Sequence, residues 1–234
     1  MTTANPIDTE QSLVLEQLLR ARHSCRAYRP EQVPRDVITR LLTIAQRSAS
    51  WCNTQPWQAI ITEGRATERF RTALEDHVRS TGPSNAFDYS APESYEGIYL
   101  ERRREAGWQL YGAVGIERGD RTGSARQAME NFRLFGAPHV AIITSDARQG
   151  TYGAVDAGVY IGTFLLAAQA LGLGAIAQAA IAGQAPFVRD HFQIPEDRKV
   201  LVGISFGYPD TAHPANSYRT SRAAIEDVAT FVDR

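Results

Sequence analysis

The segment RHSCRAYR at residues 22–29 combines residue types that bind phosphate groups. Arg22, Ser24 and Arg26 alternate along the chain, so an extended backbone points all three the same way. On a helix, Arg22 and Arg26 would lie one turn apart and again share a face. Guanidinium groups bond two phosphate oxygens at once, and the hydroxyl of Ser24 and the ring of His23 add donors. The alternative is a solvated basic turn after a helix C-terminus, where cations are favoured in any case.

A second polar segment, SASWCNTQPWQ, occupies residues 48–58 and contains Trp51 and Cys52. The amides of Asn53 and Gln55 both donate and accept hydrogen bonds, which suits the edge of a heterocycle. Pro56 fixes the chain directly after these amides. The alternative is a polar turn whose tryptophans only fill the core.

The stretch NSYRTSR at residues 216–222 holds two more arginines near the end of the sequence. Arg219 and Arg222 stand among short polar side chains, and they could close over the same phosphate as Arg22 and Arg26. The alternative is an exposed loop.

Two other patterns give weaker evidence for a binding site. The GxGxxA match at residues 172–177 follows a predicted helix and opens a predicted strand, whereas a dinucleotide fingerprint follows a strand and opens a helix. We interpret its glycines as a helix C-cap and turn. The arginines at 102–104 point in three directions on a helix, which predicts a solvated face and no shared pocket. The histidines are scattered without ligand spacing, so we expect no metal site.

Hydrophobic periodicity and turn residues predict the helices and strands around these segments. Residues 80–95, rich in Pro, Ser, Gly and Asn, predict a loop, and residues 223–233 are ambiguous between helix and strand. Helices and strands interleave without a repeat, which predicts one α+β domain with a central sheet of four or five strands. The predicted strands are 57–62, 138–145, 174–181 and 200–207, and the predicted helices are 9–21, 34–48, 65–79, 96–117, 123–134, 153–171 and 184–192.

The helix predicted at 153–171 is apolar and close to the length of a membrane span. Asp156 and Gln169 lie within it and no positive flank brackets it, so we expect a buried central helix and no membrane insertion. Ala154, Gly158 and Gly162 recur at helical spacing and form a groove that lets another helix approach. The same helix is therefore a candidate for a dimer interface.

Composition excludes several classes of protein. The 234 residues carry 25 basic and 26 acidic side chains, so no global field attracts nucleic acid or an anionic membrane. The two cysteines are too few for a disulfide framework and indicate free thiols in a reducing compartment. The first residues lack a basic and an apolar region, so we expect no secretory signal and a cytoplasmic location.

Taken together, the motifs resemble the FMN-dependent nitroreductase family. RHSCR comes first, then ASWCNTQPW, then GLGAIAQAA after the apolar helix, and then GISFGYPD and a closing arginine. Their order and spacing extend through almost the whole chain. The central stretch at 94–121 is similar to a subgroup that reduces nitrobenzoate-type aromatics.

The resemblance implies a nitroreductase-like α+β fold, with a mixed or antiparallel sheet of four to five strands flanked by helices. Residues 1–234 would form a single FMN-binding domain, with a central helical insertion at roughly 80–135. Family members are homodimers with FMN at the interface, so partner residues would complete each site. The implied reaction is ping-pong: NADPH or NADH delivers hydride to flavin N5, and a small nitroaromatic substrate then takes its place. No side chain need act as a nucleophile.

The resemblance also implies which residues contact the cofactor. The FMN phosphate and ribityl chain would be held by Arg22, His23, Ser24 and Arg26, and completed by Arg219 and Arg222. The isoalloxazine ring or ribityl hydroxyls would meet Asn53 and Gln55, the pyrimidine edge would meet Asn131, and the backbone along the ring near N5 would come from Gln178, Ala179 and Ala180.

The chain departs from some relatives at two places. Trp51 and Cys52 stand where some relatives carry Gly or Ser, and Trp51 beside the ring would narrow the pocket or stack on an aromatic substrate. Ala179 stands where some relatives carry Glu, which changes the contacts near N5. Flavin reductases, dehydrogenases and reductive dehalogenases share this architecture, and a flavin-free binding or regulatory protein is the alternative from another class.

Overall fold

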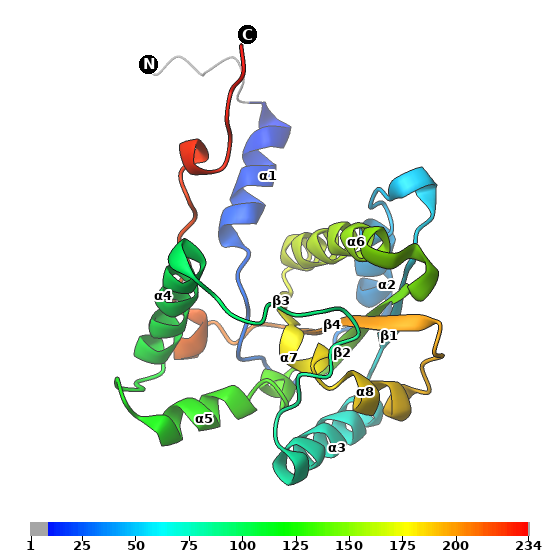
Figure 1. Cartoon of the computed structure of the whole chain (residues 1–234), viewed down its shortest axis with the longest axis vertical. Helices are drawn as coiled ribbons and strands as arrows, with labels where there is room; N and C mark the ends of the chain where they lie inside the picture. Colours follow the sequence, from blue (N-terminus) through cyan, green and yellow to red (C-terminus); the bar gives the residue numbers. More distant parts are fainter. Residues whose placement is uncertain (1–8, 234) are drawn as a thin grey trace.

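The computed structural model describes residues 9–233, and its centre is a four-stranded antiparallel sheet. The strand order is β1-β2-β4-β3, so β1 and β3 form the two edges (Figure 1). The strands are β1 Trp57–Ile61, β2 His139–Asp146, β3 Gly174–Gln178 and β4 Arg198–Gly207. This arrangement confirms the predicted α+β class and fixes the sheet as antiparallel.

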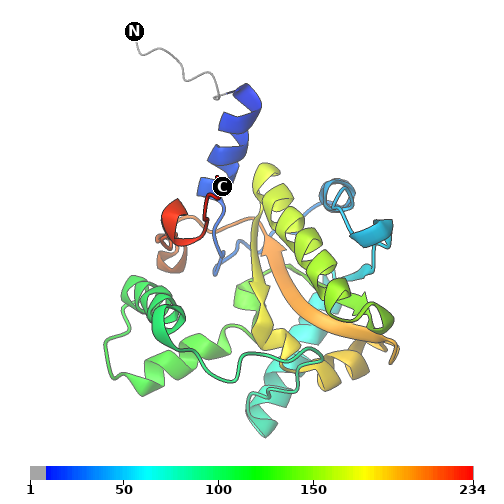
Figure 2. The ribbon, with the colours of Figure 1, turned by 45° about the horizontal axis from the view of Figure 1, so that its top comes forward.

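Strand β2 shows how the sequence builds two hydrophobic layers. Its side chains alternate between the faces of the sheet, since successive Cβ atoms of a strand point to opposite sides. Ala141 and Ile143 pack with α2 (Arg35–Ala45) and α6 (Gly150–Ala170). Val140 and Ile142 pack on the other side, with α3 (Arg65–Thr81), α7 (Ala179–Ala182) and α8 (Ala185–Phe192). The sheet is therefore enclosed between two helical layers (Figure 2).

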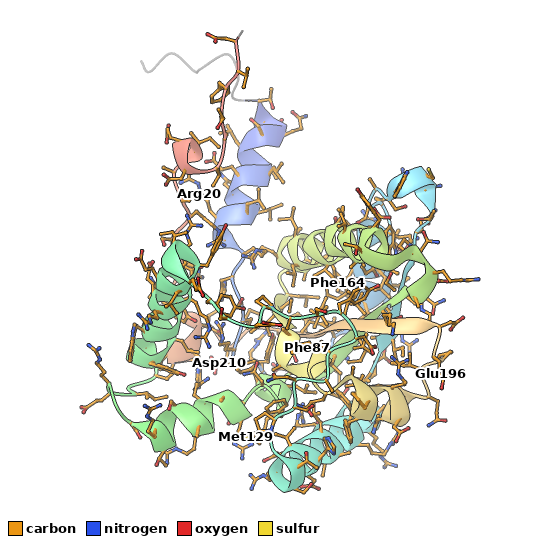
Figure 3. All side chains as sticks on the ribbon, viewed as in Figure 1. Arg20, Phe87, Met129, Phe164, Glu196 and Asp210 are labelled. Carbon is orange, nitrogen blue, oxygen red and sulfur yellow. The ribbon has the colours of Figure 1, made fainter. Side chains whose placement is uncertain are left out.

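Helix α6 is the central helix that the sequence predicts. With the preceding turn it spans Ala147–Ala170, which is long and apolar enough to cross a membrane. Here it lies on the sheet, where the buried Phe164 meets Phe206 of β4 edge to face at 5.6 Å (Figure 3). Its opposite face exposes apolar and small residues, namely Tyr152, Val155, Gly158, Val159 and Gly162.

Three helices lie away from the sheet, as Figure 1 shows: α1 (Glu10–Ala21), α4 (Gly97–Ala113) and α5 (Arg121–Met129). Thr9 caps α1 by accepting the N–H of Ser12. None of the residues of α1 or α4 is buried. Leu18 of α1 is half-buried, whereas Leu13, Leu15 and Leu19 are exposed in the isolated chain.

Several predicted boundaries are wrong. The third strand ends at Gln178, three residues early, because the chain turns into the short helix α7. Strand and helix are hard to distinguish in a run as apolar as GAIAQAAI. The predicted helices 96–117 and 123–134 end at Ala113 and Met129. The ambiguous tail at 223–233 is neither helix nor strand apart from one turn of 3-10 helix at Ile225–Asp227. Other turns of 3-10 helix occur at Trp51–Asn53, Leu134–Gly136, Ala147–Gln149 and Pro214–Asn216.

Gly174 makes a close contact between β3 and the segment that follows α1. A Cβ atom there would lie 2.6 Å from Sγ of Cys25, and Cys25 is fully buried. Gly174→Ala should therefore lower the free energy of unfolding by about 1–3 kcal/mol, the usual cost of overpacking. Urea denaturation monitored by circular dichroism measures it. Gly112→Ala in α4, where a Cβ meets open space, is the control and should cost nothing. Equal stability of Gly174→Ala and the wild type would contradict the packing.

Candidate functional site

The segment after α1 runs alongside the edge strand β3. Ser24 forms a parallel bridge with Ala175, and the N–H of Cys25 donates to the carbonyl of Ala175 at 3.2 Å. Cys25 points into the core. Because neighbours in an extended chain point to opposite sides, Arg22, Ser24 and Arg26 all line one cavity on the outer side.

The C-terminal stretch forms the facing wall of this cavity. Asn216 accepts the backbone N–H of Arg26 at 2.7 Å and donates to the carbonyl of Ala27 at 2.9 Å. The guanidinium of Arg26 donates to the Tyr218 hydroxyl at 2.7 Å. These bonds join two segments far apart in sequence and bring Arg219 and Arg222 to the cavity.

The cavity has a volume of about 530 Å³ and is strongly basic. Glu16 is its single carboxylate among the described residues, and it pairs with Arg20 at 2.5 Å. Within residues 9–233 the remaining arginines of the cavity form no ion pair. The cavity is lined by Glu16, Leu19, Arg20, Arg22, His23, Ser24, Arg26, Ala106, Tyr218, Arg219, Thr220 and Arg222.

The pKa values of two groups that line the cavity are lowered, mainly by burial and further by the nearby positive charges. Burial lowers the pKa of Arg22, and the nearby charge of Arg222 lowers it further. Burial is also the main reason that the pKa of His23 is lowered; Arg219, Arg22 and Arg26 add to the effect, against a hydrogen bond to Ala21. His23 Nε2 is buried and has no hydrogen-bond partner among the described residues. An anion with several acceptor oxygens would satisfy these groups, so the cavity fits a phosphate ester.

Three residues expected at the ring lie at the end of β3 and the start of α7. The side chain of Gln178 is buried, accepts from Ser205 at 2.5 Å and donates to the carbonyl of Asn131 at 2.8 Å. Its amide therefore fixes the 131 turn to the sheet and leaves only its backbone for a ligand. Ala179 is exposed and Ala180 half-buried. In the described part of the chain, no strand pairs with the outer edge of β3 beyond the Ser24 bridge.

The segment Trp51–Gln55 lies elsewhere, immediately before β1 at the opposite edge of the sheet. The backbone N–H of Trp51 donates to both carboxylate oxygens of the buried Asp156, each at 3.1 Å. Cys52, Asn53 and Gln55 have φ values of 51°, 57° and 46°, a left-handed conformation that is costly outside glycine and tends to occur at functional sites. The structure does not bring this segment to the arginine cavity of the same chain.

Two features of the cavity region were not anticipated from the sequence. Tyr218 and Asn216 stand in the same NSYRTSR stretch as Arg219 and Arg222, but only the fold shows that they bond to Arg26. The second feature corrects a prediction. Of the arginines at 102–104, Arg103 and Arg104 line one groove together, whereas Arg102 lines a different hollow. The expectation for the GxGxxA match is confirmed, since Gly172 (φ 73°) ends a helix and Gly174 begins a strand.

Known proteins resemble this chain over nearly its full length. A model described as the nitroreductase family matches residues 19–208. Nitroreductase NfnB of Mycolicibacterium smegmatis is 32% identical over 99% of this chain and 97% of its own. A 4-nitrobenzoate reductase of a Nocardioides species is 34% identical, over 99% and 98% of the two chains. The crystal structure of the FMN-dependent nitroreductase NfnB from Mycobacterium smegmatis in complex with NADPH superposes with a TM-score of 0.89, covering 95% of this chain and all of that one at 32% identity.

The fold and the cavity define an α+β protein with a basic cavity beside an edge strand. The match to the family model covers most of the chain, and two relatives exceed 30% identity over almost all of it. The chain belongs to the nitroreductase family. This confirms the resemblance that its motifs indicate.

His23 provides a direct reporter of the cavity. Its pKa should lie below the ordinary 6.5 in the protein without added anion, because burial and the surrounding guanidiniums disfavour the imidazolium. Inorganic phosphate at saturation should raise this pKa, since a nearby dianion favours the charged ring. An NMR titration of the histidine ring resonances measures both values.

His191, on α8 at the other face of the sheet, is the control and should not respond to phosphate. A His23 that titrates above 6.5, or that ignores phosphate, would contradict the charge arrangement described here.

Proposed function

We propose that this chain is an FMN-dependent NAD(P)H oxidoreductase that reduces nitroaromatic compounds. The observation that carries the proposal is the cavity of unpaired guanidiniums, one wall of which is the 22–26 segment that runs alongside β3. Membership of the family and the relatives named as nitroreductases and as a 4-nitrobenzoate reductase support it.

In this proposal, Arg22, Ser24, Arg26 and Arg222 bind the FMN phosphate, assisted by Arg219 and by His23. Since Nδ1 of His23 donates to the carbonyl of Ala21, its Nε2 donates to the phosphate in the protonated ring that the dianion favours. The ribityl chain then follows the outer edge of β3. From Ala175 to Gln178 the strand rises about 10 Å, which separates a phosphate at one end from a ring at the other. The backbone of Gln178, Ala179 and Ala180 lies along the ring, and Asn131 reaches the pyrimidine edge. When bound, FMN supplies the chemistry by accepting hydride from NAD(P)H and passing it to the nitro group.

We further propose a homodimer in which the partner's 51–55 segment completes each site. Trp51, Cys52, Asn53 and Gln55 stand at the wrong edge of the sheet to reach the arginine cavity of their own chain, about 14 Å away across three strand spacings. A second copy can bring them to it. Trp51 is 60% exposed and is placed to stack on an aromatic substrate.

The exposed apolar surfaces support such a dimer. The outer face of α6, Leu13, Leu15 and Leu19 of α1, and the tail residues Ile225, Val228, Phe231 and Val232 are exposed in the isolated chain. Contiguous apolar surfaces of this kind mark protein interfaces. An isologous dimer would cover the same surfaces on both copies.

The remaining parts of the proposal concern organisation and location. Residues 1–234 form one FMN-binding domain, in which 80–135 is an insertion whose helices α4 and α5 lie beside the sheet rather than on it. The cysteines Cys25 and Cys52 are free thiols, which suits a reducing compartment, and we place the protein in the cytoplasm.

The phosphate assignment predicts the flavin content of variants. Arg26→Ala and Arg22→Ala should each weaken FMN binding by about 10- to 100-fold, since a hydrogen bond to a charged group contributes about 1.5–3 kcal/mol. The ratio of flavin to protein absorbance after gel filtration measures occupancy. Arg40→Ala, which removes an exposed arginine of α2, should keep wild-type occupancy. Full retention of FMN in both cavity variants would contradict the assignment of this cavity as the phosphate site.

The dimer predicts a mass and a dependence of the cofactor on it. Light scattering should give twice the chain mass of 25.8 kDa. Val159→Asp on the outer face of α6 should produce monomer that has lost FMN, because a carboxylate buried at an apolar interface is costly. Thr72→Asp, at an exposed position of α3, is the matched control and should remain dimeric. A wild-type monomer that binds FMN fully would refute the shared site.

A further inference from the structure

A second basic site lies on α4, outside the proposed flavin contacts. It is a groove of about 560 Å³. Ala106 of α4 lines the arginine cavity and the next residue, Gly107, lines this groove, so the two sites are neighbours on one helix. The groove is lined by Arg103, Arg104, Gly107, Trp108, Tyr111 and Arg118.

The local sequence explains how the groove forms. Residues 104, 108 and 111 recur at helical spacing, so their side chains share one face of α4. The helix ends at Ala113, and Gly115 in a left-handed conformation (φ 71°) turns the chain back. This turn places the guanidinium of Arg118 over the ring of Trp108, at 5.7 Å from its centroid.

The charges of the groove are uncompensated. Its lining includes three guanidiniums and no carboxylate. Among residues 9–233, none of these arginines takes part in an ion pair, whereas arginines such as Arg71, Arg133 and Arg189 each pair with an acid. Trp108 is 46% exposed. The groove therefore offers an aromatic face and several convergent cations, the combination that binds an anion attached to a planar ring.

We propose that this groove binds the adenosine 2′-phosphate end of NADPH, an inference that rests on the proposed use of NAD(P)H as electron donor. The adenine stacks on Trp108, and the phosphate bonds Arg103 and Arg118. A dianion matches several guanidiniums better than a single carboxylate does. The GxGxxA match is a helix cap, so the adenosine end has no dinucleotide-binding turn there. An open groove suits a part of the cofactor that takes no part in the chemistry.

Isothermal titration of the FMN-loaded protein with adenosine 2′,5′-bisphosphate and with 5′-AMP tests binding directly, because bound FMN occupies the arginine cavity and leaves only the groove for these nucleotides. The bisphosphate should bind at least about tenfold more tightly than 5′-AMP, because each phosphate–guanidinium pair is charge-assisted. The double variant Arg103→Ala/Arg118→Ala should lose this preference, and Trp108→Leu should weaken both ligands. Arg126→Ala, an exposed arginine of α5, removes one positive charge from the same insertion outside the groove and should behave as wild type.

Steady-state kinetics provide the second measurement. In the double variant, KM for NADPH should rise about tenfold, while kcat and the KM for NADH stay unchanged. Equal binding of the two nucleotides by the wild type, or an unchanged preference in the double variant, would overturn the inference. So would a rise confined to the KM for 4-nitrobenzoate, which would assign the groove to an aromatic carboxylate. Failure of the wild type to take up FMN would instead count against the proposed function.

Discussion

The guanidiniums of Arg22, Arg26, Arg219 and Arg222 share one cavity at the edge of the sheet, and among the described residues the one carboxylate of its lining, Glu16, pairs with Arg20 instead. Like charges held this close repel one another, and burial of Arg22 adds a desolvation cost. The bonds of Asn216 and Tyr218 to the 26–27 backbone and guanidinium hold the two segments together against this repulsion. A bound phosphate would remove the repulsion, so ligand binding and stability of this region are linked.

The order of the strands decides what one chain can do alone. The cavity belongs to β3 and the amide-rich 51–55 segment belongs to β1, at opposite edges of the sheet. In the proposed dimer, a two-fold axis would solve this problem by bringing the β1 end of one copy to the β3 end of the other. The same axis would account for the outward-facing apolar residues of α1 and α6, which contribute nothing to the core of the isolated chain.

The success and failure of the sequence predictions have physical causes. The alternation of Arg22, Ser24 and Arg26 predicted a shared face because one bridge to Ala175 keeps the segment extended. The location of Gln55 at the edge of the sheet opposite the arginine cavity was not predictable from spacing, since it depends on which edge of the sheet β1 occupies. The groove at Arg103 was missed because Arg118 closes it from beyond the helix, after the turn at Gly115. Local sequence patterns therefore determine the helices and strands, whereas contacts between elements distant in the sequence determine the binding sites.

In the proposed site, unpaired guanidiniums recognise the phosphate of FMN. Titration of the flavin-free protein with FMN and with riboflavin, followed by flavin fluorescence, isolates this contribution because the two ligands differ only in the phosphate. At least two charge-assisted bonds contribute about 3 kcal/mol or more, so FMN should bind at least about 100-fold more tightly than riboflavin. Equal affinities for the two flavins would contradict recognition of the phosphate by these guanidiniums.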